Sequence, residues 1–376
     1  MNTINNTGHR TFLNEIEQAV QAATAHAIAS GHWQQYEGPN GKSLAAKMAD
    51  RIGQSHVQLT SSGTAALEIV LRAAGIGAGD EVLLSSYDYP GNFWAIERVG
   101  ARPVLVDTSV DSWRIDFASL ERTFQPTCKA IIASHLHGEL QQVDALRAWC
   151  DQRKVLLVED VCQSLGAHWQ GAPIGSYGHA AILSFGGGKL LSCGRGGAWA
   201  TSDEMLAIKA RVAAGAGSGP YALSELQAAT VLAQLPWLVE INARCRTFFL
   251  ELDRQLKVRS CNWTFVPKSA IDSTAFYQCG WQLNESVTDQ CRQLLLTKLR
   301  HTRPNPEGAV VELPIGIGFP GFHRRSTRRC RASTPLTNAV AAANRTVVMH
   351  HRVVLNQLWT PDQLANWISA IIAGIQ

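Results

Sequence analysis

The stretch VLLVED, at residues 155–160, is a run of apolar residues that ends on two carboxylates. Four other short segments have the same character, namely EVLLSS (81–86), RPVLVD (102–107), AIIASH (130–135) and AAILSF (180–185). Nearly continuous apolar runs bounded by polar residues are typical of strands that are buried on both faces. Segments of helical length lie between them, over residues 64–74, 91–99 and 143–153. The alternation predicts an α/β fold with a mainly parallel sheet and helices on both faces.

Patterns outside these strands predict how the chain divides. The chain has 376 residues, more than one compact domain usually needs. Apolar residues at helical spacing over residues 11–29 predict an opening helix, within an N-terminal helical segment over 1–50. The strand-helix alternation then defines a large domain over 51–238. Beyond it the alternation fades, and a closing helix over 360–375 ends a smaller α+β domain over 239–376.

The composition excludes several classes of protein. Lys and Arg number 34 against 30 Asp and Glu, so the net charge of +4 provides no general attraction for nucleic acid. No apolar stretch is long enough to span a membrane, and the first residues lack the apolar core of a signal peptide, so we expect a cytoplasmic protein. Nine cysteines without a Cys-x-x-Cys pair fit neither a disulfide framework nor a structural zinc site.

Polar residues at the ends of the predicted strands point to a ligand site, because ligands of parallel sheets bind outside the carboxyl ends of the strands. Asp107, Ser134, Asp160 and Ser184 occupy such positions. Upstream, LTSSGTAAL at residues 59–67 places hydroxyl groups and a glycine before a helix. Free N–H groups and the helix dipole favour an anion such as phosphate there. An ordinary Ser or Thr helix cap is the alternative.

A lysine in a glycine-rich loop is the candidate nucleophile. Lys189 follows three glycines in LSFGGGKLLSCGRGG (183–197), where a partly desolvated amine could form an imine. A solvated loop lysine is the alternative, and the spacing of a nucleotide-binding P-loop is not met. Asp160 could face a protonated ring nitrogen or cap a helix. An anion-binding helix start, a strand-terminal Asp and a Gly-embedded Lys, in this order, together describe a pyridoxal phosphate site.

With these motifs, the sequence resembles the DegT/DnrJ/EryC1/StrS family of sugar aminotransferases, which are fold-type I enzymes that use pyridoxal phosphate. The resemblance runs from about residue 27 to the last helix and is sharpest between Leu59 and Leu235. It rests on SGHWQQYEGPNGKSLAAKMAD (30–50), SSGTAALEIVLRAAGIGAGDEV (61–82), VGARPVLVD (99–107), VEDVCQSLGA (158–167), LSFGGGK (183–189), GRGGAWAT (194–201) and LSELQAATVLAQL (223–235). It implies a mainly parallel sheet of the seven-stranded type.

The resemblance also implies roles for seven residues. Lys189 is the Schiff-base lysine and the catalytic residue, Asp160 pairs with the pyridinium nitrogen, and Gln163 hydrogen-bonds the phenolic oxygen. The phosphate is bound by Gly63, Thr64 and Ser184. The aromatic ring of Tyr89 stacks on the cofactor. No metal site is implied.

By this resemblance the protein transfers an amino group from glutamate or glutamine to a keto sugar, possibly nucleotide-linked, or a related cyclic ketone. Small-molecule substrates, a homodimer and a biosynthetic role are expected, without membrane or nucleic-acid partners. Two alternatives stay open. The same cofactor could serve elimination, decarboxylation or condensation on an amino acid, or the fold could belong to a non-catalytic regulator or binding protein.

Three stretches depart from the family pattern or carry separate hypotheses. The segment 211–227 lacks the Asn that reaches the neighbouring subunit's cofactor in many relatives, and Ala222 stands where Arg is common. The segment 86–97, SYDYPGNFWAIE, differs from the usual Thr/Phe-rich version, whereas Lys189 argues against relatives in which His replaces it and dehydration results. Five arginines within 323–331 suggest an anionic substrate such as a nucleotide-linked sugar, nucleic acid, a solvated surface loop or a basic rim at a subunit interface.

Two histidines at the end of a predicted strand raise the question of a metal. His135 and His137 would share one face if the strand continued. No third ligand at a telling spacing accompanies them, so we expect no metal site. Family resemblance places His135 near the active site without a defined role.

Overall fold

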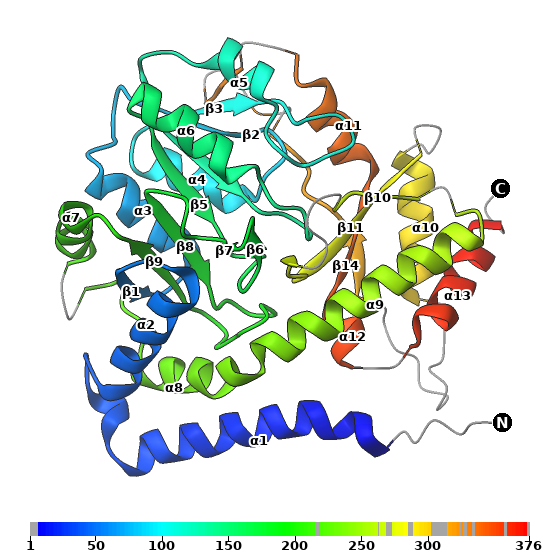
Figure 1. Ribbon diagram of the computed structural model, residues 1–376, viewed down its shortest axis with the longest axis horizontal. Coiled ribbons are helices and arrows are strands. Elements are labelled where there is room, and N and C mark those ends of the chain that lie inside the picture. The colour runs from blue at the N-terminus through cyan, green and yellow to red at the C-terminus, as the bar shows by residue number, and fades with distance from the viewer. Residues whose placement is uncertain are drawn as a thin grey trace.

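The apolar runs form the centre of an eight-stranded sheet in a computed structural model of the chain (Figure 1). The order is β1 (His56–Thr60), β9 (Gly197–Thr201), β8 (Ala180–Ser184), β5 (Leu156–Asp160), β4 (Cys128–Ser134), β2 (Glu81–Ser85), β3 (Arg102–Val106) and β13 (Arg331–Ala332). β9 runs antiparallel to both neighbours, and the other pairs are parallel. The predicted α/β fold is confirmed. The structure describes residues 7–215, 219–261, 263–267, 273–284, 289–301, 314–322, 325, 329–332, 335–356 and 359–373.

The sheet has one strand more than the seven-stranded type that the resemblance implies. The additional strand is β13, which comes from late in the chain and pairs in parallel with β3, with Arg331 opposite Val104. β1 and β9 were not identified from apolar runs, because His56 and Gln58 interrupt the first and the second consists of Gly, Ala, Trp and Thr. β9 hydrogen-bonds β1 on one side and β8 on the other. This pairing stabilises β1 and β9 as strands, although their composition alone does not predict strands.

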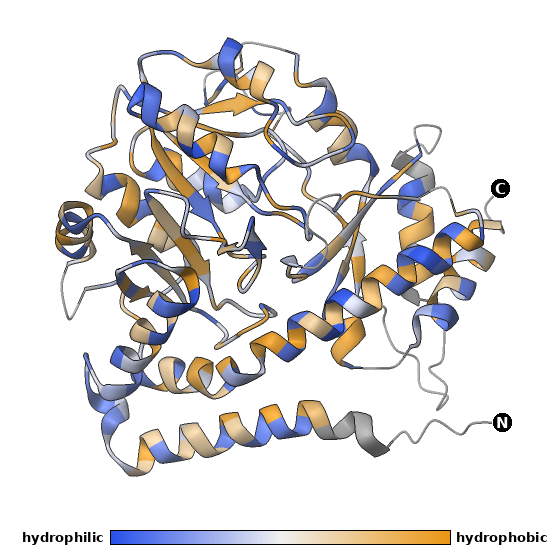
Figure 2. Cartoon of the chain, in the orientation of Figure 1, coloured by the Kyte–Doolittle hydropathy of each residue, from blue (hydrophilic) through white to orange (hydrophobic). Residues whose placement is uncertain are grey.

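Successive side chains of the central strands point into two separate cores, as the pleat requires. One core packs Leu84 and Ile132 against α3 (Gly63–Ala73), α4 (Pro90–Arg98) and α7 (Glu204–Ala214). The other packs Leu83 and Ile131 against α5 (Phe117–Thr123) and α6 (Val143–Arg153). Figure 2 shows the central strands as mainly hydrophobic, whereas the helices carry polar residues as well. The sheet is therefore a buried middle layer, and its polar strand ends are the exception.

The N-terminal helices pack beside the later helices (Figure 1). The elements are α1 (Thr7–Ala29), η1 (His32–Gln34), α2 (Pro39–Ile52), α8 (Glu225–Gln234), η2 (Leu235–Trp237) and α9 (Leu238–Val258). Phe12 of α1, Leu44 of α2 and Val231 of α8 share one hydrophobic core. The predicted boundary between residues 238 and 239 falls at the start of α9, and the division into domains stays a prediction.

A second sheet of four antiparallel strands lies beside the first (Figure 1). Its order is β10 (Trp263–Phe265), β11 (Gln278–Leu283), β14 (Thr346–His350) and β12 (Ile315–Ile317), accompanied by α10 (Asp289–His301), α11 (Thr337–Arg345), α12 (Arg352–Leu355) and α13 (Pro361–Ala373). A two-stranded ribbon, β6 (His168–Trp169) with β7 (Ala172–Pro173), completes the described strands. α13 corresponds to the predicted closing helix.

Gly280 of β11 lies where the second sheet meets the large domain. A Cβ atom at Gly280 would lie 2.1 Å from the Trp113 ring and 3.0 Å from His137 Cβ. The Gly280 N–H group also donates to His137 O at 3.2 Å. Only a residue without a side chain fits this contact without displacing the indole.

We therefore expect Gly280→Ala to lower the free energy of unfolding by about 1–3 kcal/mol through overpacking. Urea unfolding followed by tryptophan fluorescence measures the change. Gly77→Ala is the matched control, because the nearest atom to its Cβ would be Val99 O at an ordinary 3.6 Å. Equal stability of the two variants would show that Trp113 moves aside freely.

Candidate active site

A cavity of about 320 Å³ lies at the carboxyl ends of the central strands, where the sequence predicted a ligand site. All seven residues proposed for the cofactor line it, namely Gly63, Thr64, Tyr89, Asp160, Gln163, Ser184 and Lys189. These residues come from β5, β8, the starts of α3 and α4, and the loops that follow the strands. The structure thus brings the candidate set together, while the individual roles stay predictions.

The start of α3 forms one wall of the cavity. Ser62 caps this helix, and its Oγ accepts the Ala65 N–H at 3.0 Å, as in the cap alternative. The N–H groups of Gly63 and Thr64 form no hydrogen bond with any residue that the structure describes. A Cβ at Gly63 would lie 3.0 Å from Cys162 Sγ and 3.1 Å from Leu183 O. The cap therefore coexists with two N–H groups that a ligand anion can use.

Asp160 ends β5 with a buried carboxylate. Its Oδ1 accepts the Cys162 N–H at 3.0 Å, and its Oδ2 accepts Asn92 Nδ2 at 2.8 Å. Ser134 Oγ lies 3.5 Å from Oδ2. All of these donors are neutral. None of the described residues that hydrogen-bond the Asp160 carboxylate is therefore a cation. A ligand cation in the cavity would supply that partner.

Lys189 is held in a half-buried position at the end of its glycine-rich loop. Its N–H donates to Gly186 O at 3.1 Å, and its Nζ lies 4.2 Å from the centroid of the Tyr277 ring. Burial lowers the pKa of the Lys189 ammonium below its usual value, against an opposing influence of Asp160. A depressed pKa increases the fraction of neutral amine, which is the nucleophilic form.

Tyr89 and Gln163 also line the cavity. The Tyr89 side chain is 44% exposed, and a Cβ at Gly91 would lie 2.3 Å from Tyr89 Cε1, so Gly91 leaves the ring its space. Gln163 Oε1 accepts the His137 N–H at 3.1 Å. This bond fixes the amide and leaves its NH₂ group as the donor for a ligand oxygen.

Three cavity-lining residues had not been predicted, and Ser134, expected near the site from its strand-end position, hydrogen-bonds one of them. Asn92 and Cys162 line the cavity and hydrogen-bond Asp160, Ser134 Oγ accepts the Asn92 amide at 3.1 Å, and Tyr277 lies over Lys189. Asn92 follows Tyr89 within the first turn of α4, so the unusual segment 86–97 carried the signal. Tyr277 precedes β11 and had no sequence signal, because only the tertiary fold brings it to the loop.

The two histidines at the strand end serve different partners. His135 Nε2 lies 3.4 Å from Glu159 Oε2, and its Nδ1 accepts the Gln141 N–H at 3.1 Å. His137 Nε2 lies 3.0 Å from the Tyr87 hydroxyl, and burial lowers the pKa of this imidazole to about 3. β4 ends before them, and His137 has a φ of 54°, so the shared strand face does not form. Among the described residues no group of three or more His, Cys, Asp or Glu could hold a metal ion.

The arginine-rich stretch holds the late chain against the large domain. Arg331 pairs with Glu81 at 2.7 Å, and Arg329 pairs with Glu97. The Arg325 guanidinium lies 5.4 Å from the Phe93 ring centroid. Arg324 and Arg328 lie outside the described residues. The placed guanidinium groups thus make contacts within the chain.

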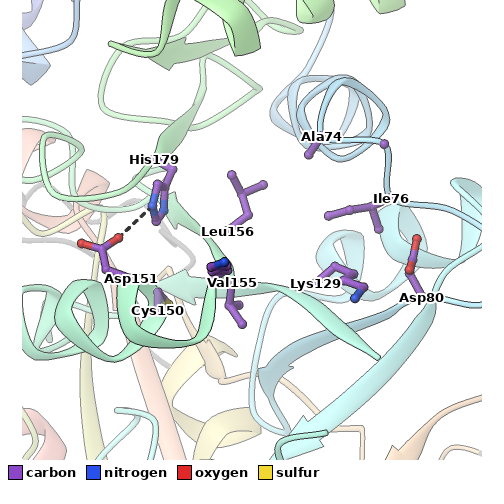
Figure 3. A pocket seen from close by; sticks show the side chains of 11 residues that line it. Ala74, Ile76, Asp80, Lys129, Cys150, Asp151, Val155, Leu156 and His179 are labelled. Atoms are coloured by element: carbon purple, nitrogen blue, oxygen red, sulfur yellow. Dashed lines mark hydrogen bonds and ion pairs between the residues drawn. The ribbon is translucent and has the colours of Figure 1, made fainter. Parts of the chain in front are cut away.

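A larger cavity of about 590 Å³ lies at the opposite, amino ends of β4 and β5 (Figure 3). Several of its polar side chains already have partners in the chain. His179 Nδ1 accepts the Leu157 N–H, so its Nε2 donates to Asp151 at 3.0 Å, and Lys129 Nζ donates to Pro126 O at 2.9 Å. We therefore place the candidate active site in the smaller cavity.

None of the described helices is both long and apolar enough to cross a membrane.

Comparison with known proteins identifies relatives along most of the chain. The erythromycin biosynthesis sensory transduction protein EryC1 of Saccharopolyspora erythraea is 36% identical over 65% of this chain and 69% of its own length. GDP-perosamine synthase of Caulobacter vibrioides is 36% identical over 50% of this chain and 54% of its own. The chain thus spans only about half the length of some curated relatives.

Solved structures show the same architecture over nearly the whole chain. An aminotransferase from Brucella abortus is 25% identical, covers 100% of this chain and 99% of its own, and superposes with a TM-score of 0.79. 3-Amino-5-hydroxybenzoic acid synthase is 26% identical, with 95% and 97% covered and a TM-score of 0.79. Residues 14–358 match one family description. As predicted, the chain belongs to the DegT/DnrJ/EryC1/StrS aminotransferase family.

Proposed function

We propose that this protein is a pyridoxal-phosphate aminotransferase that moves an amino group from glutamate or glutamine to a keto sugar, possibly nucleotide-linked, or a related cyclic ketone. The observation that carries the proposal is the convergence of Lys189, Asp160 and the α3 N-terminus on one cavity. Relatives support the acceptor class: their names include GDP-perosamine synthase and L-glutamine:scyllo-inosose aminotransferase of Streptomyces griseus.

The residues present fit pyridoxal phosphate in charge and hydrogen bonding. The N–H groups of Gly63 and Thr64, with the Ser184 hydroxyl, suit the dianionic phosphate. The Asp160 carboxylate suits a protonated ring nitrogen, and the Gln163 amide suits the phenolic oxygen. The space that Gly91 leaves for Tyr89 lets this aromatic ring cover one face of the cofactor.

When bound, the cofactor supplies an electron sink for the bond cleavage at the amine-bearing carbon. The chain's residues prepare that chemistry. Asp160 would keep the facing nitrogen protonated, because none of the described residues that hydrogen-bond its carboxylate is a cation. Lys189 Nζ would provide the neutral amine that holds the cofactor and would serve as the general acid and base that carries a proton at the amine-bearing carbon. Tyr277 shields Lys189 from water on one side.

The homodimer that the resemblance implies stays a prediction, which light scattering on the purified protein tests.

We expect the cofactor-loaded protein, given L-glutamine or L-glutamate without an acceptor, to release about one equivalent of 2-oxo acid per subunit, because the amine stays behind on the enzyme. Adding GDP- or dTDP-linked keto sugars or scyllo-inosose should restore continuous turnover with the right acceptor. Mass spectrometry detects the aminated product. Continuous release of carbon dioxide or ammonia without an acceptor would instead establish decarboxylation or elimination.

A further inference from the structure

A second buried carboxyl group lies beside Asp160. Asp88 is fully buried between β2 and α4, at 0% exposure. Asn92 Nδ2 bridges the two carboxyl groups, 3.3 Å from Asp88 Oδ1 and 2.8 Å from Asp160 Oδ2. Ser134 Oγ bridges them again, 2.9 Å from Asp88 Oδ2 and 3.5 Å from Asp160 Oδ2. We call these four residues the carboxyl cluster.

One hydrogen-bond arrangement of the carboxyl cluster places a proton on Asp88. The Ser134 hydroxyl has one hydrogen to donate; its Oγ accepts the Asn92 amide at 3.1 Å and lies 2.9 Å from Asp88 Oδ2 and, more distantly, 3.5 Å from Asp160 Oδ2. If Asp88 carries a proton on Oδ2, it donates to Ser134 Oγ, and Ser134 donates onward to Asp160 Oδ2. Asp88 Oδ1 then remains the acceptor for the Tyr89 N–H at 2.6 Å. Every polar atom of the bridge has a partner in this arrangement.

The electrostatic surroundings of Asp88 also favour a proton on this side chain. Burial and the neighbouring Asp160 carboxylate raise the pKa of Asp88 well above its ordinary value. The other titratable groups near the two carboxyls are the Cys162 thiol, whose pKa burial also raises, the half-buried Tyr89 phenol and the Lys189 amine. Lys189 interacts with Asp160 rather than forming an ion pair with Asp88. Two ionised carboxylates without a cation between them would be costly at this depth.

We infer that Asp88 is a positioning residue that stays protonated at neutral pH and, through Ser134 and Asn92, fixes Asp160 as the single negative charge facing the cavity. The inference deepens the proposed function and rests on it, because the oriented charge serves the cofactor's ring nitrogen. Asp88 also anchors the backbone of Tyr89, so one side chain links the ring-stacking residue to the charge-bearing one.

Infrared spectroscopy of the wild-type holoenzyme at neutral pH, in H₂O and D₂O, tests the protonation directly. We expect one isotope-sensitive carbonyl stretch from a buried carboxylic acid, and its loss in Asp88→Asn. Asp107→Asn is the matched control and should keep the band, because Asp107, buried at the end of β3, accepts the N–H groups of Asn338 and Ala339 as a carboxylate does. A wild-type spectrum without the band, or a band that survives in Asp88→Asn, overturns the inference.

The pH dependence of unfolding gives a second readout. The native wild type holds one proton that the unfolded chain releases above about pH 4, so its stability falls as pH rises. The Asp88→Asn variant lacks that proton. The ratio of its unfolding equilibrium constant to that of the wild type should therefore fall about tenfold per pH unit above about pH 4, up to the pH at which native Asp88 ionises. Parallel pH profiles would contradict a proton on Asp88.

Cofactor binding separates failure of this inference from failure of the proposed function. We expect Asp88→Asn to bind pyridoxal phosphate within about threefold of the wild type, because the amide reproduces the neutral acid, and Ser134→Ala to bind about tenfold more weakly. Wild-type protein that binds no cofactor refutes the proposed function whatever the infrared spectrum shows. Cofactor binding with the wrong infrared or pH result refutes only the role of Asp88.

Discussion

Lys189→Ala is expected to lower the rate of amino transfer by about 10⁴-fold, because the variant loses both the nucleophilic amine and the proton carrier. The cavity's other contacts remain, so the protein should still bind pyridoxal phosphate. Steady-state kinetics with the glutamine donor and a keto-sugar acceptor measure the loss. Exogenous small amines such as methylamine should restore part of the activity, since they can enter the space that the side chain leaves.

Two further variants make this expectation specific. Lys189→Arg keeps a positive charge, but a guanidinium does not lose its proton near neutral pH and cannot act as the nucleophile, so it should be as inactive as Lys189→Ala. Lys47→Ala alters an exposed lysine of α2 and should match the wild type. Retained activity in Lys189→Arg would mean that Lys189 provides only charge, and the proposed chemistry would be wrong.

Asp160→Asn is expected to lower amino transfer by about 10²–10³-fold, as when a preorganised charge that stabilises a transition state is removed. The amide has one acceptor oxygen, so it can keep the bond from the Cys162 N–H but not also the bond from Asn92, and it cannot keep the facing nitrogen protonated. The donor half-reaction, measured in single turnovers, should slow as much as the complete cycle.

The control for this variant is Asp144→Asn. Asp144 accepts hydrogen bonds from Trp169 and Gln170, and it lies outside the residues that line the candidate site. It should leave both half-reactions unchanged. If Asp160→Asn weakens donor binding but leaves the rate of the bound complex unaltered, Asp160 acts in binding alone, and its assignment to the ring nitrogen fails.

Much of the fold could be predicted because its strands are buried on both faces. Apolar runs such as VLLVED are visible in the sequence, and they became β2, β3, β4, β5 and β8. β1, β9 and β13 escaped detection since their stability depends on pairing rather than on composition. Arg331, for example, lies in a strand because Glu81 and the edge of β3 meet it there.

Some residues of the candidate site could likewise be predicted from the sequence, and others could not. Lys189 and Asp160 could be selected from the sequence because each combines an unusual residue type with a telling local position. Tyr277 could not, since it reaches Lys189 only when the second sheet packs beside the first. Asp88 was visible as part of an atypical segment, but its relation to Asp160 depends on two strands and a helix meeting at one point. Tertiary packing, rather than local pattern, therefore determines how the charges are arranged.

The most direct test of the account is a peptide map of the cofactor-supplemented protein after borohydride reduction. We expect a phosphopyridoxyl group fixed to the Nζ of Lys189, in the peptide that contains LSFGGGKLLSCGR. Lys189→Ala should carry no such label at this position. An unmodified Lys189 in protein saturated with cofactor, or a label confined to surface lysines such as Lys47, would contradict the central claim.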